Sequence, residues 1–570
     1  MDEMSDQVRG VIFVVVVLVV IFLWSHFFTP AVPPQQKSVQ TSSQQGAAPQ
    51  GSASQTASTQ PSAKAVPAEE AKAANIAVAE AAAENIVAID SGLYHVELSN
   101  QGGVVHSWKL KKYFDDQKPP QPLELVDSGA AQQLGWPFSV LLSDSQLESR
   151  ANSALYEVTP SDSTQDAPTT ITFHWSDGHL DITKKLNFTQ DYEMSAEVTA
   201  SLDGQPLPVA LAWRGGFGDK AVYKAPSLVT VFYKSNDKLN LLQYKKLGVS
   251  GNQSQPLAQP GPMQFLGIED QFFTATFLPA GTDLSLWHWT QDHKITVDGK
   301  PGTEPTAEMA AGTTTGVPLH VRVFVGPKDI GILAKEMPSL EQQVNFSWTG
   351  VIAKPLLFIL QWLHRFIPGW GWTIIVLTMV INFALFPLKF KSQRSMQRMA
   401  KVAPEIRSIQ DRYKKYSMSD PRKRQMNEEV MAIYQREGIN PVGGCLPMLP
   451  QLPIWWALWR VLNGAIELRH APWLWIHDLS AKDPYYILPV AMAILMYLST
   501  KMTPQTTIDP SQQKMMAFMP LMMAAFFFNL SSGLNLYMFT SNLIGVGQQY
   551  YLNRTQPLPT PKPKFKKKKE

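Results

Sequence analysis

The residues best placed to do chemistry in this chain are polar side chains within apolar stretches. Asn382 lies in one such stretch, residues 371–388, and Gln451 and Arg460 lie in the next one. Polar groups are costly in hydrocarbon, and they usually face the interior of a helix bundle or a wet cavity. Between the two stretches, residues 389–437 contain thirteen Lys or Arg against six Asp or Glu. This pattern indicates a membrane protein that handles a polymer or a charged substrate.

Signatures of an enzyme or a metal site are missing from the sequence. It contains no HExxH, no GxSxG, no Walker lysine loop and no dinucleotide-binding glycine pattern. The one cysteine, Cys445, rules out an intrachain disulfide, and it has no nearby histidine cluster that would favour zinc binding or thiol catalysis. We therefore expect no catalytic residue, no metal and no cofactor.

Several apolar segments are long enough to cross a bilayer. Six membrane spans are expected, at about 10–28, 370–388, 444–462, 485–501, 514–530 and 534–552. The first segment could instead be a cleaved signal peptide, but its leading residues are net acidic, which favours an uncleaved anchor. The basic segments 389–437 and 553–570 are expected on the cytoplasmic side, which makes both termini cytoplasmic.

The large segment between the first two spans has the pattern of β-structure. Tyr94, Val96 and Leu98 alternate with polar residues, and a turn at residues 176–178 separates two runs of strand-forming residues. Short strands joined by Gly- and Pro-rich turns predict an all-β sandwich. The residues before it, 30–86, are rich in Gln, Ser, Ala and Pro and predict a flexible linker, in which 68–86 could form a short Ala-rich helix.

Residues 348–366 predict an amphipathic helix that lies in the membrane interface. Lys354, Gln361 and Arg365 share one helical face, and aliphatic residues occupy much of the remainder. The alternative is an ordinary helix packed on the β domain.

The basic segment breaks near Pro421, which can start a helix and disfavours helical geometry just before it. Two helices therefore form a cytoplasmic hairpin. Its flexible methionines suit contact with varied apolar partners, and they include Met396, Met399, Met426 and Met431. The alternative is a solvated hairpin that touches anionic lipid headgroups.

The C-terminal tail is a polybasic segment with no capacity for a packed core. Its expected partners are anionic lipids or ribosomal RNA, and the alternative is a charge that only fixes topology. The lysines concerned are Lys562, Lys564, Lys566, Lys567, Lys568 and Lys569.

Four motifs resemble a known family, the YidC membrane protein insertases. They are INPVGGCLPMLPQLPIWWALW (439–459), ELRHAPWLWIHDLSAKDPYYILP (467–489), DPSQQKMMAFMP (509–520) and SSGLNLYMFTSNL (531–543). The order of parts also resembles the Gram-negative form of the family. These parts are an anchor (1–29), a linker (30–86), a β domain (87–340), an interfacial helix (341–369), a five-span core (370–553) with a cytoplasmic hairpin (389–441), and a basic tail (554–570).

The resemblance implies a periplasmic β-supersandwich beside an α-helical polytopic core of the bacterial inner membrane. It implies a hydrophilic groove, open to the cytoplasm and to lipid, through which new membrane proteins are inserted and helped to fold. The ribosome, the Sec translocon and nascent membrane proteins are the implied partners. Thr378, Asn382, Gln451 and Tyr537 match groove positions of the family.

This sequence departs from the family at one groove position. Bacterial members typically carry an arginine in the first core span, and Asn382 stands at the matching position. We hypothesise that Arg460, in the second core span, replaces the missing charge. The alternative is that Arg460 extends to the periplasmic interface, because it lies late in an outward-running span.

Two other classes of function compete with an insertase. A small-solute transporter or channel would predict paired carboxylates or internal repeats in the spans, and the core spans lack Asp and Glu apart from terminal positions. A membrane-tethered carbohydrate-binding protein would predict that the β domain alone is functional.

Overall fold

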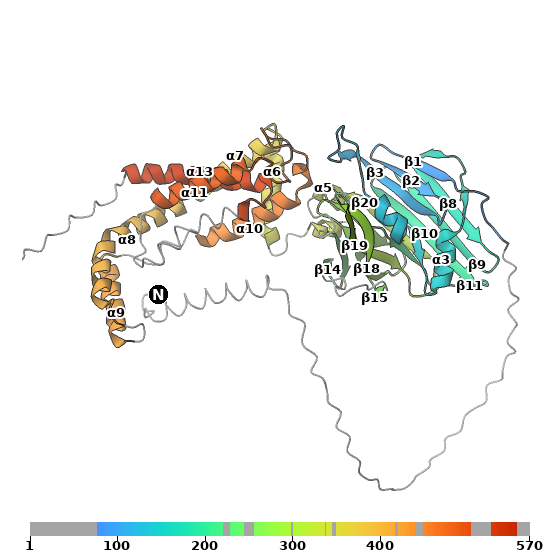
Figure 1. Cartoon of the computed structure of the whole chain (residues 1–570), viewed down its shortest axis with the longest axis horizontal. Coiled ribbons are helices and arrows are strands. Elements are labelled where there is room, and N and C mark those ends of the chain that lie inside the picture. Colours follow the sequence, from blue (N-terminus) through green and yellow to red (C-terminus); the bar gives the residue numbers. More distant parts are fainter. Residues whose placement is uncertain are drawn as a thin grey trace, which may run out of the picture. The chain divides into compact units, whose positions relative to one another are not determined.

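The computed structural model describes most of the chain between residues 77 and 555 (Figure 1). The described ranges are 77–220, 229–243, 256–297, 300–336, 338–344, 349–416, 420–438, 448–502 and 526–555. The expected first span, the linker up to residue 76, most of the span at 514–530 and the basic tail lie outside these ranges. Strands dominate up to residue 327, and helices dominate after it.

One sheet begins with the alternating segment that the sequence identified. Its strand order is β4-β3-β2-β1-β7, and β1 pairs with β7 in parallel while the other pairs are antiparallel. Tyr94, Val96 and Leu98 of β2 are all buried, as period-2 patterning requires. The strands are β1 (Ile86–Asp90), β2 (Tyr94–Ser99), β3 (Val104–Phe114), β4 (Pro122–Glu124) and β7 (Thr164–Asp166).

A larger sheet contains the hairpin that the sequence predicted. Strands β8 and β9 pair antiparallel from Thr169↔Phe188 to Ser176↔Asp181, which confirms the turn at 176–178. The strand order is β14-β13-β16-β17-β20-β10-β9-β8-β6, with β11 on β10. Its strands are β6 (Glu157–Thr159), β8 (Thr169–Ser176), β9 (Leu180–Phe188), β10 (Glu193–Leu202), β11 (Gln205–Pro206), β13 (Thr230–Ser235), β14 (Lys238–Gln243), β16 (Phe265–Glu269), β17 (Phe273–Pro279) and β20 (Leu319–Pro327).

A third antiparallel sheet has the order β15-β18-β19-β12-β5. Its strands are β5 (Ser139–Leu141), β12 (Ala210–Trp213), β15 (Leu257–Gln259), β18 (Ser285–Val297) and β19 (Lys300–Gly312). Two short helices, α2 (Ser128–Leu134) and α3 (Ser145–Ser153), are inserted among the strands. Asp127 and Asp144 cap their N-termini by accepting backbone hydrogen bonds.

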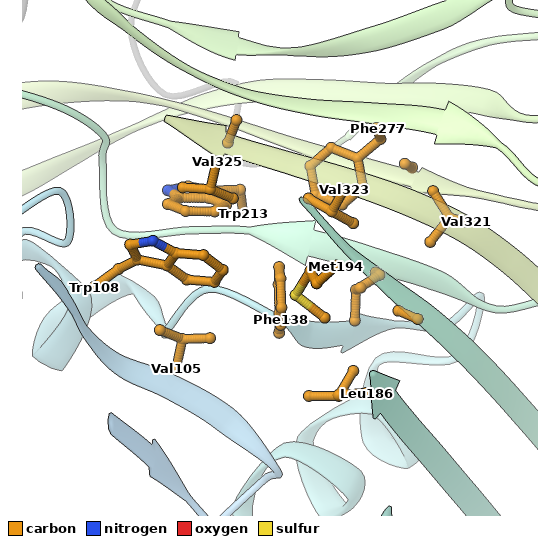
Figure 2. Packing of buried hydrophobic residues seen from close by; sticks show 14 of the residues in the cluster. Val105, Trp108, Phe138, Leu186, Met194, Trp213, Phe277, Val321, Val323 and Val325 are labelled. Atoms are coloured by element: carbon orange, nitrogen blue, oxygen red, sulfur yellow. The ribbon is translucent and has the colours of Figure 1, made fainter. Parts of the chain in front are cut away.

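The three sheets share one hydrophobic core. Figure 2 shows Phe138 beside Trp108 of β3 and Met194 of β10, all of them buried. The ring of Phe138 makes edge-on contacts with Trp108 and Trp213, at centroid distances of 6.3 and 6.1 Å. Such aromatic packing adds to the roughly 1.5–3 kcal/mol gained by burying each large apolar side chain.

The end of the predicted linker is part of this β-structure. Ala79 and Ser176 exchange two backbone hydrogen bonds of 2.9 Å, and Glu84 accepts a hydrogen bond from Ser99. The possible Ala-rich helix therefore does not extend into residues 77–86. Pairing with a buried strand satisfies this backbone, whereas a helix with no burial face would gain little from packing.

Helices follow the last strand. The first is α5 (Ile330–Glu336), and the segment expected to form an interfacial helix forms α6 (Gly350–His364). The remaining helical elements are η2 (Pro338–Gln343), α7 (Trp370–Ala384), α8 (Phe386–Tyr413), α9 (Pro421–Arg436), α10 (Met448–Gly464), η5 (Ile466–Leu468), α11 (Ile487–Met502) and α13 (Ser532–Thr555).

Helices α6, α7, α10, α11 and α13 share a second apolar core. Helix α13 packs against both α7 and α11, and α10 packs against α6 (Figure 1). Within the described ranges, no single helix combines the length and apolar character of a membrane crossing. The pair α7 and α8, bent by 53° at a short break, has enough of both. The six expected spans stay a prediction.

Candidate functional site

A cluster of polar side chains lies inside the apolar core, where α7 meets α13. Asn382 is 2% exposed, and its Nδ2 donates to Thr378 O at 2.8 Å and to Ser541 Oγ at 3.3 Å. Thr378 is fully buried and donates through Oγ1 to Ile374 O at 2.6 Å. Local backbone acceptors thus offset part of the cost of burying these polar groups.

Lys389 reaches back into the same cluster. Its Nζ donates to Asn382 Oδ1 at 2.7 Å, although Lys389 lies in the first turn of α8. Residues seven apart lie on one helical face, about 10 Å apart along the axis, and helical side chains point toward the N-terminus. The long stem of Lys389 spans that separation across the bend at Leu385. We call Thr378, Asn382, Lys389 and Ser541 the Asn382 cluster.

Tyr537 and Gln451 bring a second polar pair into the core. Tyr537 of α13 is 2% exposed, and the side chain of Gln451 on α10 adjoins its hydroxyl. Yet Tyr537 Oη and Gln451 Oε1 are buried with no hydrogen bond of good geometry to any described residue. Buried groups without partners are rare and costly, so this pair is a candidate contact for a polar group from elsewhere.

Arg460 lies apart from the Asn382 cluster. It is on the exposed face of α10, and the hydrogen bonds of Asn382 go to Thr378, Lys389 and Ser541. The sequence argument therefore missed Lys389 and Ser541 as contacts of Asn382. The spacing of seven residues between Asn382 and Lys389 was the available signal for the first of them. No signal in the sequence pointed to Ser541.

The basic hairpin is a packed unit rather than two separate helices. Val402, Ile406, Ile409 and Ile433 form an apolar seam between α8 and α9, and Met399 and Met426 pack against it. Met431 is 40% exposed, whereas the side chain of Met396 lies outside what the structure describes. The ion pairs Arg412–Glu429 (2.9 Å) and Arg436–Glu405 (2.8 Å) also join the two helices.

Helix α6 exposes large apolar side chains next to its polar face. Lys354 pairs with Glu341 at 2.8 Å, and Gln361 donates to Glu467 at 2.6 Å, so both polar residues contact protein. Burial raises the pKa of Glu467. Lys354 and Arg365 stay exposed, and beside them the segment exposes the large apolar residues Val351, Phe358, Ile359, Trp362 and Phe366. This distribution suits a helix whose outer side meets lipid.

Two further predictions concern a metal site and the lysines of the C-terminal tail. No group of His, Cys, Asp or Glu within the described ranges could hold a metal ion. Lys562, Lys564, Lys566, Lys567, Lys568 and Lys569 lie outside those ranges.

Both halves of the chain match family models. The model described as 60Kd inner membrane protein matches residues 362–559, and the YidC periplasmic domain model matches residues 86–359. Family members are thus inner membrane proteins with a periplasmic domain.

Named relatives give the same result. The membrane protein insertase YidC of Methylobacillus flagellatus is 30% identical over 565 residues, covering 96% of this chain and 97% of that one. That of Cupriavidus taiwanensis is 37% identical over 350 residues, covering 61% of this chain and 60% of that one. The latter match thus spans less than two thirds of the relative.

A solved structure is also similar to the chain. The crystal structure of an active YidC insertase with its first transmembrane domain resolved covers 84% of this chain and 95% of that one, at 18% identity and a TM-score of 0.35. From the two family models and the full-length relative, the chain belongs to the YidC family of membrane protein insertases.

Proposed function

We propose that the protein inserts newly made membrane proteins into the bacterial inner membrane by giving their polar segments a hydrophilic path. The observation that supports this most is the Asn382 cluster, which places amide, hydroxyl and ammonium groups inside an apolar helical core. A charge at mid-membrane costs roughly 3 to more than 10 kcal/mol, depending on the reference state. Polar groups that replace water along the path lower that cost.

The mechanism is non-enzymatic. A short hydrophilic segment of the substrate contacts Thr378, Asn382, Gln451 and Tyr537 while its apolar segment partitions into lipid. Tyr537 Oη and Gln451 Oε1 can take up hydrogen bonds from a passing polypeptide, since each has no hydrogen bond of good geometry within the described residues. The name carried by the relatives gives no support to the small-solute transporter.

The topology and partners follow from charge and family. Both termini are cytoplasmic, six helices cross the membrane, and the β domain lies in the periplasm. The ribosome and anionic lipids are polyanionic, so they bind the basic hairpin and the lysine-rich tail. The family resemblance implies the Sec translocon as a further partner.

Site-specific crosslinking tests the proposal. A photoreactive residue at position 382 or 451 should crosslink to a stalled nascent membrane protein, and one at exposed position 358 on α6 should do so much less. The same probe at position 460 tests the Arg460 hypothesis. Crosslinks absent from 382 and 451 but present on the outer helix faces would contradict a polar path through the core.

The β domain provides a second test. A variant that lacks most of residues 87–325 should still insert substrates if the helical core carries the activity. Loss of all insertion by this variant, with its helical core folded, would favour a function that resides in the β domain.

A further inference from the structure

The loop that follows α10 contacts the β domain through Arg469. The guanidinium donates from Nε and Nη2 to Asp219 Oδ2, at 2.8 and 2.6 Å, and from Nη2 to Phe114 O at 2.7 Å. The side chains of Arg469 and Asp219 are only 4% and 2% exposed. Both residues belong to one compact unit, residues 72–570. A buried ion pair therefore joins the helical core to the β domain.

Asp219 is held in place by a second carboxylate of the β domain. Asp270 Oδ2 accepts a hydrogen bond from the backbone N–H of Asp219 at 2.7 Å. Its Oδ1 accepts from the N–H groups of Phe272 and Phe273 at 2.7 and 2.6 Å. All of these groups lie between β12 and β17, so the backbone that carries Asp219 is fixed by the β domain itself. The acceptor for the arginine is thus preorganised.

The described contacts around this ion pair are mostly polar. Gln271 Nε2 donates to Asn463 O at 2.8 Å, and His470 Nε2 lies 2.8 Å from Asp116 Oδ1. These four residues also line a cavity of about 430 Å³ at the same place. Ile466 adds an apolar contact, since it is 5% exposed and joins the core of the β domain. Polar interfaces between domains of one chain are ordinarily able to open, unlike large apolar ones.

We propose that Arg469 and Asp219 form a releasable latch that docks the β domain on the helical core in one register. Attraction between two charges is much stronger in a low-dielectric surrounding than in water. A misaligned docking would leave both charges buried and unpaired, so the latch also excludes other registers. Because the two parts belong to one chain, an open latch closes again in an intramolecular step. This inference goes beyond the proposed insertion mechanism, which does not depend on it.

A thiol at position 466 measures how often the latch opens. The experiment uses the full-length protein in lipid nanodiscs, with Ile466→Cys as the reporter and Cys445→Ser to remove the one natural thiol. Position 466 is buried in the docked arrangement, so a water-soluble maleimide reaches it only after the β domain moves away. The labelling rate is therefore proportional to the open fraction when opening and closing are fast.

Loss of either charge should open the latch. Arg469→Gln should raise the labelling rate on the order of a hundredfold, because one partner of a buried pair is left uncompensated. Asp219→Asn should act alike from the β-domain side. Arg469→Lys keeps the charge and should raise the rate much less. The exchanged pair, Arg469→Asp with Asp219→Arg, should label more slowly than either charge-reversed variant alone.

Lys482→Gln is the matched control. It removes a cation from the next loop of the helical core, where Lys482 donates to Asn529 at 3.1 Å. Both residues of this hydrogen bond belong to the helical core, so the labelling rate should stay at the wild-type value.

Four outcomes overturn the proposal. They are wild-type labelling as fast as that of an unfolded chain, an unchanged rate in Arg469→Gln, an equal rise in Lys482→Gln, and effects that simply add in the exchanged pair. Thermal unfolding of Asp219→Asn distinguishes an open latch from an unfolded protein. Its midpoint should stay close to that of wild type, and a large fall in the midpoint would assign the faster labelling to unfolding and also overturn the latch.

Discussion

A Cβ atom on Gly371 would lie 2.3 Å from Cγ and Cδ1 of Trp473, so the α7 backbone is in direct contact with this indole. Trp473 belongs to the loop after α10, and its ring also makes an edge-on contact with Trp372 at a centroid distance of 5.7 Å. The absence of a side chain at Gly371 thus fixes where that loop lies against the start of α7.

Gly371→Ala should destabilise the helical core. The new methyl group forces the Trp473 ring to move, and overpacking of this kind costs about 1–3 kcal/mol, which exceeds the roughly 1 kcal/mol gained in helix propensity. Thermal unfolding in detergent measures the loss. Gly545→Ala in α13 is the control, since nothing lies within 4 Å of its added Cβ, and it should unfold at an equal or higher temperature. Equal unfolding temperatures for wild type and Gly371→Ala would contradict the contact.

Asp483 organises the loop before α11. Its Oδ2 accepts a hydrogen bond from Leu488 N at 2.7 Å, while its Oδ1 accepts from Tyr485 N and from Trp475 Nε1 at 3.1 and 3.2 Å. The carboxylate is buried, so Asp483→Ala leaves three hydrogen-bond donors without an acceptor. It should lower the free energy of unfolding by about 2–4 kcal/mol. Asp478→Ala, which frees only contacts to Ser480, should cost less in the same unfolding measurement. A ranking in the reverse order would contradict this role.

Tyr537→Phe should slow insertion without lowering stability, because it removes one polar group of the Tyr537–Gln451 pair. The Tyr537 hydroxyl has no hydrogen bond of good geometry to any described residue, so its removal should leave the free energy of unfolding unchanged or raise it by up to about 1–3 kcal/mol. Insertion should nevertheless slow, because a polar contact for the substrate is lost. Tyr550→Phe, at an exposed position of the same helix, should affect neither property. Normal insertion by Tyr537→Phe would remove this residue from the proposed path.

Lys184 makes the stability of the β domain depend on pH. Its Nζ donates to the carbonyl oxygens of Gly102, Gly103 and Phe138 at 2.7, 3.0 and 2.8 Å, inside the core. Burial lowers the pKa of Lys184 from 10.5 to about 7. Between these two values the unfolded chain binds a proton that the folded chain does not, so the Lys184 contribution to stability should increase as the pH rises from 7 toward 10.5.

The measurement compares wild type with Lys184→Met across that pH range. The variant leaves three buried carbonyl groups without a donor, so it should be less stable than wild type at every pH. It should also lack the increase in stability with pH that the titration of Lys184 causes. Parallel curves of unfolding temperature against pH for the two proteins would contradict a shifted pKa.

Local patterning in the sequence was enough to identify many elements. Alternation at Tyr94, Val96 and Leu98 predicted a strand with one buried face, and residues 176–178 predicted a hairpin, which β8 and β9 form. The segment before Pro421 was expected to separate two helices, and α8 and α9 flank it. These features depend on neighbours within a few residues, for which backbone geometry and side-chain period are decisive.

Features that depend on distant partners were not predictable in this way. The linker was expected to continue to residue 86, but Ala79 pairs with Ser176, nearly a hundred residues later. The sequence predicted that Lys354 and Gln361 share one face of α6, but it did not predict their contacts with Glu341 and Glu467. In each case the contact depends on a residue that is distant in sequence and is brought close only by folding.

The sequence by itself determined that polar groups lie within apolar segments next to a basic hairpin, and the match of Asn382 to the family's arginine position stays a prediction. Only the tertiary structure decided which groups meet. It joins Asn382 to Lys389 across a bend and to Ser541 on a helix 159 residues away, and it leaves Arg460 outside that cluster. The physical reason is that composition and period fix which face of a helix is polar, whereas the bend and the packing of α7 on α13 fix which polar atoms come within hydrogen-bonding distance.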